Sequence, residues 1–207
     1  MYHQKSLIPS GGGEIDFDRP KEIENHLDAL ILSDSLIYQT NSDTIVWSEH
    51  NELQWSDFKG KSDTISNHKA MTYVQVTLNP KEYSDSIVIH VKTLFFRNKS
   101  WTKNNESIEL LSHEQLHFNI AELISRKIRK QFSSYEYSDV NLAYKILQEI
   151  YDDHYPKMLR EYNYKYDHDS NHGTIKEQQR EWELKIAKEL KEMKEYSSTK
   201  VTVKRIK

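Results

Sequence analysis

The longest stretch of helical periodicity spans residues 104–132, which contain neither proline nor glycine. Its apolar positions fall near one face of a helix: Leu110, Ile120, Leu123, Ile124 and Ile128. Three polar residues at the predicted start can cap it, namely Asn104, Asn105 and Ser107. Basic residues crowd the predicted end, where they suit the helix dipole and are expected to be solvated: Arg126, Lys127, Arg129 and Lys130. The pattern predicts one long central helix.

Two further helices are predicted, one on each side of a polar loop at residues 164–173. The first runs through Tyr151 or beyond, until Pro156 interrupts or bends it. Its cap is one of two residues, Ser138 or Asp139. The second opens on a capping box at residues 174–177 and has an apolar stripe of Trp182, Ile186 and Leu190. Residues 1–36 are predicted to form an N-terminal arm with one short helix.

Between residues 35 and 97 the apolar positions change to a period of two, which is typical of strands. The alternation is clearest in residues 70–78 and 87–96, with Asn79-Pro80 as the expected turn between them. Aromatic residues near these segments are expected to pack on them: Trp47, Trp55 and Trp101. The predicted fold class is α+β, with a small antiparallel sheet packed on the central helix and on the C-terminal helices.

Composition narrows the class of protein. The 207 residues suffice for one buried domain, expected at residues 37–196, followed by a mobile basic tail at residues 197–207. A net charge of −3 gives no reason to expect nucleic acid as a partner. The absence of cysteine excludes disulfides and thiolate metal sites. No apolar run is long enough to cross a membrane, and the start of the chain lacks the apolar core of a signal peptide.

The central helix carries the motif His113-Glu114-Gln115-Leu116-His117. Residues four apart lie on one face of a helix, about one turn from each other. Two neutral imidazoles in this arrangement can bind one Zn²⁺, and Glu114 can act as general base on a metal-bound water. Both histidines fall on the apolar stripe, where an inward imidazole needs a partner. A metal is one such partner; the alternative is a pair of histidines satisfied within an ordinary helix.

A catalytic zinc usually takes three protein ligands, so a third must come from elsewhere in the chain. Glu122 lies about 140° around the helix from His117 and is expected to be exposed or to support the site indirectly. The polar loop before the last helix offers better candidates, because loops carry functional groups more often than packed faces do. Those candidates are His168, Asp169 and His172, and the residues alone do not choose between them.

Several segments resemble a bacterial family of predicted secreted zinc-dependent proteases that carries the HExxH motif. Around the motif they are residues 110–122 and the block Tyr166-Asp167-His168-Asp169-Ser170-Asn171-His172-Gly173, with Gln179 and Trp182 after it. Residues 47–60 and Ser100-Trp101 resemble the N-terminal half of the same family, so the likeness covers about residues 45–192. The family block reads Tyr-Asp-x-x-Thr-x-His-Gly, and Ser170 stands in place of its threonine and keeps a hydroxyl.

The resemblance implies a zincin-like fold that binds Zn²⁺, with His172 as the third ligand beside His113 and His117. It implies hydrolysis of a peptide or protein substrate, with Glu114 as the general base. It also implies an extracytoplasmic location, either periplasmic or secreted.

Supporting roles follow for residues near these ligands. Tyr166 is a candidate oxyanion donor, and Asp167 or Asp169 is a candidate for orienting a ligand imidazole. The strand predicted at residues 87–96 is a candidate for pairing with an extended peptide substrate.

Two other functions are open to the same residues. One is a non-catalytic binding module of the cell envelope with a structural or vestigial metal site. The other is a metal hydrolase of cell-wall amides. It would share the zinc and the general base with a peptidase and would differ only in the residues that line the cleft. The intact Glu114 argues against the binding module, because zinc ligation needs the histidines but not that carboxylate.

Overall fold

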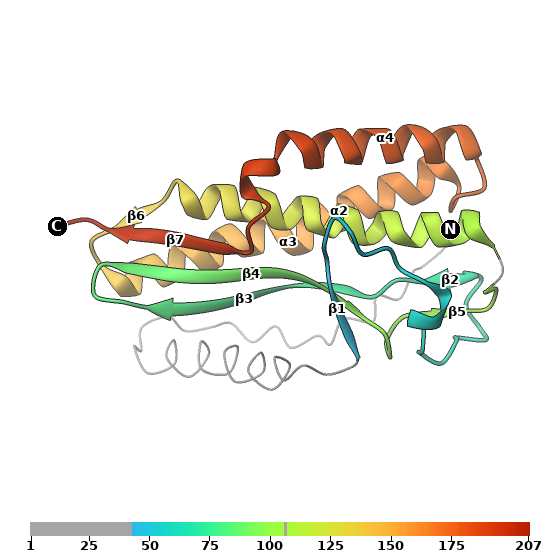
Figure 1. Cartoon of the computed structure of the whole chain (residues 1–207), viewed down its shortest axis with the longest axis horizontal. Coiled ribbons are helices and arrows are strands. Elements are labelled where there is room, and N and C mark those ends of the chain that lie inside the picture. The colour runs from blue at the N-terminus through green and yellow to red at the C-terminus, as the bar shows by residue number, and fades with distance from the viewer. Residues whose placement is uncertain (1–42, 106) are drawn as a thin grey trace, which may run out of the picture.

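A five-stranded sheet and three helices make up most of the computed structural model, which describes residues 43–105 and 107–207 (Figure 1). The predicted N-terminal arm at residues 1–36 lies outside the described residues. In chain order the elements are β1 (Thr44–Val46), η1 (Trp55–Asp57), β2 (Ala70–Met71), β3 (Val74–Glu82), β4 (Ser86–Phe96), β5 (Trp101–Thr102), α2 (Ile108–Ser133), β6 (Glu136–Tyr137), α3 (Val140–Ser170), α4 (Lys176–Glu192), η2 (Lys194–Tyr196) and β7 (Lys200–Arg205). The fold class is α+β, as predicted.

The sheet is built around β4, the longest strand. β3 pairs with one edge of β4 along its whole length, and β1 and β7 share the other edge. β6 pairs with β7 in parallel, so the sheet is mixed and the prediction of a purely antiparallel sheet is wrong in this detail. A separate two-stranded ladder joins β2 to β5.

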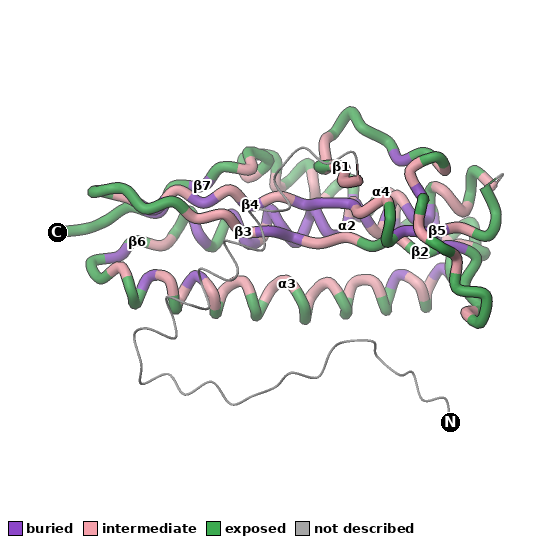
Figure 2. The backbone as a smooth tube through the Cα atoms, turned by 90° about the horizontal axis from the view of Figure 1, so that it is seen from below, coloured by how far each residue is buried: buried purple, intermediate pink, exposed green. Residues whose placement is uncertain are grey.

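One apolar face of the sheet packs against α2 and α3, and α4 packs on these two helices (Figure 1). The predicted alternation in β4 is confirmed, because Ile87, Ile89 and Val91 are buried while the residues between them are partly exposed. Ile124 and Ile128 of α2 meet this face. The buried positions run along the length of β4 and α2 (Figure 2). None of the described helices is long and apolar enough to cross a membrane.

The basic tail is a strand rather than a mobile end. β7 buries Val201 and Val203 in the main core, while the residues between and after them are exposed. With only two apolar positions among basic and polar neighbours, this segment carries too weak a pattern to predict a strand from sequence. Residues 200–205 therefore belong to the folded domain.

Pro80 does not form a turn but lies inside β3. The ladder between β3 and β4 pairs Tyr83 with Ser86, which puts the turn at residues 83–86. Tyr73 accepts a hydrogen bond from Phe96 in the same ladder, so the odd-numbered residues of β3 bond to β4 and the even-numbered ones face away. Pro80 thus lies at a position of β3 whose backbone N–H is not needed for pairing with β4, and such edge positions tolerate proline.

The helix starts agree with the predicted caps at two places. Ser107 accepts a hydrogen bond from the Leu110 N–H at the start of α2, and Asp139 accepts one from the Leu142 N–H at the start of α3. The predicted capping box of α4 is wrong, because the Thr174 hydroxyl donates to the Asn171 carbonyl instead.

The α3 helix passes through Pro156 and continues to Ser170, so most of the predicted polar loop is helical. Pro156 lies on the exposed side of the helix, where its ring meets solvent and not a packed neighbour. This correction matters for the site, because it places the residues around Asp167 on a rigid element.

A buried charged cluster fixes α2 to the sheet. Glu122 accepts hydrogen bonds from Arg126 at 3.0 Å and from Arg129 at 2.8 Å, and all three side chains are almost fully buried. Arg129 also donates to the Val91 carbonyl of β4, and Arg126 donates to the Leu190 carbonyl of α4. Glu122, Arg126 and Arg129 are thus not solvated as predicted, because hydrogen bonds from neighbouring elements compensate their buried charges, whereas Lys130 is exposed as predicted. The other expectation for Glu122, that it supports the site indirectly, stays a prediction.

We expect Glu122→Gln to lower the free energy of unfolding by about 3–5 kcal/mol, because it removes the carboxylate that faces the buried Arg129 and leaves the buried Arg126 with only the exposed Glu49. Urea unfolding followed by circular dichroism measures this change. The matched control is Glu161→Gln at an exposed position of α3, which we expect to change stability by less than about 0.5 kcal/mol. Equal stability of the two variants would contradict a supporting role for the cluster.

Candidate metal centre

The two motif histidines lie one turn apart on α2, as predicted. Their rings meet at right angles, and the two Nε2 atoms are 3.2 Å apart. His113 is only 3% exposed, and His117 is partly buried. The helix therefore brings one nitrogen from each ring to a common point.

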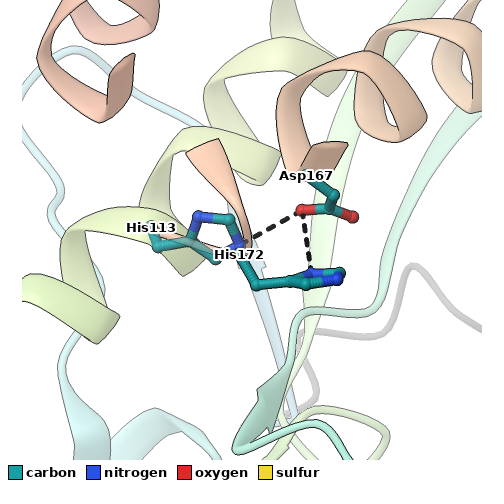
Figure 3. Close-up of side chains that lie close together, drawn as sticks. All are labelled: His113, Asp167 and His172. Atoms are coloured by element: carbon teal, nitrogen blue, oxygen red, sulfur yellow. Dashed lines mark ion pairs between the residues drawn. The ribbon is translucent and has the colours of Figure 1, made fainter. Parts of the chain in front are cut away.

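The third group at this point is Asp167 of α3. Its Oδ1 atom lies 3.2 Å from His113 Nε2 and 3.1 Å from His117 Nε2. Figure 3 shows one oxygen of the Asp167 carboxylate directed at both the His113 ring and the His172 ring. The sequence pattern predicts only an orienting role for Asp167, because it predicts a loop at residues 164–170, where the structure has a helix that faces α2.

The outer nitrogens of both rings face amide oxygens. His113 Nδ1 lies 3.3 Å from Gln179 Oε1, and His117 Nδ1 lies 3.0 Å from Asn163 Oδ1. Since an amide oxygen only accepts hydrogen bonds, each Nδ1 carries the hydrogen and donates it. Each Nε2 is then left with a lone pair that points towards Asp167.

Three electron-pair donors thus converge on one point, which a cation, either a metal ion or a proton, must share. Asp167 Oδ1 is buried, and within the described residues it makes no hydrogen bond of acceptable geometry despite the short distances to both rings. Zinc at about 2.0–2.1 Å from tetrahedral ligands separates those ligands by roughly 3.3 Å. The observed separations of 3.1–3.2 Å fit a shared zinc ion closely.

A proton is the competing occupant of this point. Burial disfavours the His117 imidazolium, but the carboxylates of Asp167 and Glu114 outweigh burial and raise the pKa of His117 to about 9. Burial also favours protonated Asp167, yet the two imidazoles hold the pKa of this carboxyl well below its usual value. The metal-free centre therefore holds a proton on His117 at neutral pH.

His172 comes from the turn between α3 and α4. Its Nδ1 lies 3.7 Å from Asp167 Oδ1, and it shares with His113 and Asp167 a set of donor atoms within 4.8 Å of one another. The His172 side chain is 54% exposed, and its ring packs edge-on against His68. His172 is thus near the centre but farther from it than Asp167.

The other two candidates for the third ligand do not join the centre. His168 is 73% exposed and lies near Asp169. Asp169 accepts a hydrogen bond from the Trp182 indole at 3.1 Å, which directs it towards α4. Of the three candidates weighed from the sequence, only His172 approaches the motif histidines.

The turn that carries His172 is held in an uncommon backbone conformation. Asn171, His172 and Gly173 all have positive φ, at 46°, 53° and 75°. The Ser170 hydroxyl accepts from the Gly173 N–H and donates to the Tyr166 carbonyl, so the hydroxyl kept at this position braces the turn. A Cβ atom at Gly173 would lie 3.0 Å from the His113 side chain, so only glycine allows this close approach.

Tyr166 supports His113 from behind and is not placed as an oxyanion donor. Its ring stacks on the His113 ring at 4.6 Å, and its hydroxyl donates to Gln179 Oε1 at 2.6 Å. The side chain is fully buried and is not among the residues that line the cavity. Burial raises the pKa of Tyr166 far above its usual value, which keeps the hydroxyl protonated as a donor.

A cavity of about 830 Å³ opens over the centre. Glu114 lines it beside both histidines and is only 4% exposed. The opposite side is formed by residues 67–72, which lead into and include β2. The Thr72 hydroxyl donates to the Glu114 carbonyl at 3.3 Å, which sets this segment next to the motif. Glu114 is thus the acidic side chain of the motif that faces the cavity.

Two site residues, Asn163 and Gln179, were not assigned roles from the sequence. Gln179 interrupts an otherwise apolar stripe of α4, and a polar residue at such a position signals a buried hydrogen bond. Asn163 lies one helical turn before Asp167, but that spacing is informative only once this segment is known to be helical.

We expect Gln179→Met to weaken zinc binding about 10–100-fold, because it removes the acceptor that fixes the His113 ring. Competition with a coloured chelator measures the affinity. The control is Gln178→Met at the preceding position of α4, which we expect to bind zinc like the wild type. Unchanged affinity in Gln179→Met would show that His113 is not held through Nδ1.

Zinc binding near neutral pH should release about one proton, because the metal displaces the proton held on His117. Affinity should therefore rise with pH by about tenfold per unit and level off above pH of about 9. Calorimetry in buffers of different ionisation enthalpy counts the protons. Binding without proton release would mean that His117 is neutral in the metal-free protein or is not a ligand.

No family model, curated protein or solved structure that was compared matches this chain. The resemblance to predicted secreted zinc-dependent proteases, and the extracytoplasmic location it implies, therefore stay predictions.

Proposed function

We propose that this protein is a zinc-dependent hydrolase of the zincin type that cleaves peptide bonds. The observation that carries the proposal is the convergence of His113 Nε2, His117 Nε2 and Asp167 Oδ1 within 3.2 Å of one another, beside a cavity. Three donors of this kind with an open side are typical of a catalytic zinc site and not of a closed structural one.

The separations favour Asp167 over His172 as the third ligand. Asp167 lies within 3.2 Å of both motif histidines, whereas His172 approaches only to 3.7 Å from Asp167 itself. Asp167 also belongs to a helix, and His172 to an exposed turn. In this arrangement His172 lines the cavity, where its imidazole can contact a bound substrate.

Glu114 is the general base in this proposal. Zinc, when bound, supplies Lewis acidity that polarises a carbonyl group and lowers the pKa of water towards about 7. Glu114 accepts the proton of the attacking water and passes it to the leaving amine. Its burial in the cavity wall keeps the carboxylate close to the reacting groups and away from bulk water.

A peptide substrate is supported by a strand edge at the cavity that no strand of residues 43–105 or 107–207 pairs with. In the ladder between β2 and β5, Lys103 donates to the Lys69 carbonyl. Backbone groups of successive residues in a strand point to opposite edges, so those of Ala70 and Thr72 point away from β5. Both residues line the cavity. An extended peptide can add to this edge through backbone hydrogen bonds. The earlier candidate, β4, has both edges occupied by other strands.

The binding-module alternative gains no support from these contacts. A metal held for stability requires the imidazoles and Asp167, but not a second carboxylate buried beside them. Burying the Glu114 carboxylate costs free energy, and a general-base role explains why this carboxylate is kept, which metal ligation alone does not. The polar cavity also gives no specific reason to prefer a cell-wall amide over a peptide.

We expect wild type, Glu114→Gln and His172→Ala to bind about one zinc per chain, and Asp167→Asn to bind at least about tenfold more weakly. Wild-type protein should hydrolyse unstructured peptides, and Glu114→Gln should be slower by about 10²–10⁴-fold. Zinc content by mass spectrometry and peptide cleavage by chromatography measure the two effects. His168→Ala, an exposed change on α3, is the control for both assays.

Loss of zinc in His172→Ala with retention in Asp167→Asn would restore His172 as the third ligand. Zinc binding without hydrolysis of any peptide would refute the peptidase while leaving the metal site standing. A zinc-free wild type, even after addition of zinc, would refute both.

A further inference from the structure

The strand edge that faces the cavity is open for only a short length. It is formed by Ala70 and Thr72, whose backbone groups point away from β5 into the cavity. The chain continues directly into β3, where the even-numbered residues face the same way. The next backbone group of this edge therefore belongs to Val74.

Side chains of α3 occupy the edge from Val74 onwards. The Tyr155 hydroxyl donates to the Val74 carbonyl at 3.3 Å, and the Tyr151 hydroxyl donates to the Val76 carbonyl at 2.9 Å. Burial raises the pKa of Tyr155 to about 12, so its hydroxyl stays protonated as a donor. α3 runs alongside the sheet over this length (Figure 2). An added strand therefore cannot extend past Val74.

The opposite end of the cavity opens to solvent. Glu109 and Lys176 line it there, form an ion pair at 3.3 Å, and are both mostly exposed. A peptide on the Ala70 edge thus has room to leave the protein on this side. The strand edge therefore has one closed end, where Tyr155 bonds to Val74, and one open end.

The closed end lies close to the reacting groups. The Thr72 hydroxyl contacts the backbone of Glu114, and Val74 follows two residues later. At about 3.4 Å per residue, this leaves space for roughly two or three substrate residues between the cleaved bond and Tyr155. A longer segment on that side would collide with the tyrosines.

Strand direction decides which end of a peptide lies there. β2 runs from Ala70 towards Val74, and antiparallel pairing is the more stable arrangement of two strands. A peptide paired antiparallel to β2 runs the opposite way, with its amino end at the closed end and its carboxyl side leaving past Lys176.

We propose that the cleft accepts the free amino end of a peptide and releases short amino-terminal fragments, and that it does not cut within long chains. This inference rests on the proposed peptidase function. It adds the class of substrate and the residue, Tyr155, that limits it.

The test uses the zinc-loaded full chain and one long unstructured peptide, biotinylated either at its amino end or at its carboxyl end and bound to streptavidin. We expect streptavidin at the carboxyl end to leave the cleavage rate within about twofold, and streptavidin at the amino end to abolish cleavage. Mass spectrometry should place every cut within roughly three residues of the free amino end. Cuts in the interior, or only near the carboxyl end, would overturn the inference and leave the peptidase intact.

Two variants test the role of Tyr155. Tyr155→Ala removes the ring from the edge, and we expect longer fragments from the amino end and partial cleavage of the amino-blocked peptide. Tyr155→Phe keeps the ring and should give fragments of wild-type length. Tyr164→Ala, at an exposed site of the same helix, is the control.

Unchanged fragment lengths in Tyr155→Ala, with folding verified by circular dichroism, would overturn the assignment of the closed end. No cleavage of any peptide by zinc-loaded wild type would instead refute the proposed function, and this inference with it.

Discussion

Three lone pairs directed at one point are the constraint on which this structure depends. Gln179 and Asn163 hold the hydrogens of the two imidazoles on their outer nitrogens, so the inner nitrogens face the Asp167 carboxylate without a hydrogen between them. Such an arrangement is stable only around a cation, whether a proton or a metal. Each of the three helices contributes to it: α2 provides the imidazoles, α3 the carboxylate, and α4 the amide that orients His113. The packing of these helices is therefore as important for the centre as the motif itself.

The buried charges of α2 serve a related purpose at the other end of the helix. The two arginines paired with Glu122 donate to backbone carbonyls of β4, α4 and η2, which fixes the helix along its axis. An apolar stripe alone allows a helix to slide slightly along its axis, because hydrophobic contact is non-directional. Hydrogen bonds to fixed carbonyls are directional and prevent this sliding. The cluster thus sets the position of the motif residues relative to β2, and with it the geometry of the cleft.

The sequence predicted the elements whose pattern is local. The periodicity of α2, its Ser107 cap and the alternation in β4 were all confirmed, and the motif gave two of the three converging ligands. The misses have physical causes. The second half of α3 was not predicted as helical, because it contains Pro156 and a run of polar residues. Exposed positions of a helix tolerate a proline and polar residues alike. With that helix hidden, Asp167 could not be placed opposite the histidines. Glu122 was expected to be exposed, since its partner Thr93 in β4 and the carbonyls that bind Arg129 are distant in sequence.

The turn at His172 has a consequence for how such a chain evolves. A residue other than glycine with φ of 53° carries a conformational cost of about 1–2 kcal/mol. Selection for thermal stability alone would replace this histidine with glycine, as at the next position in the chain. At this position, selection for function would therefore keep the histidine, whereas selection for stability would remove it. In a lineage that no longer needs the function, replacement of His172 by glycine would make the fold more stable.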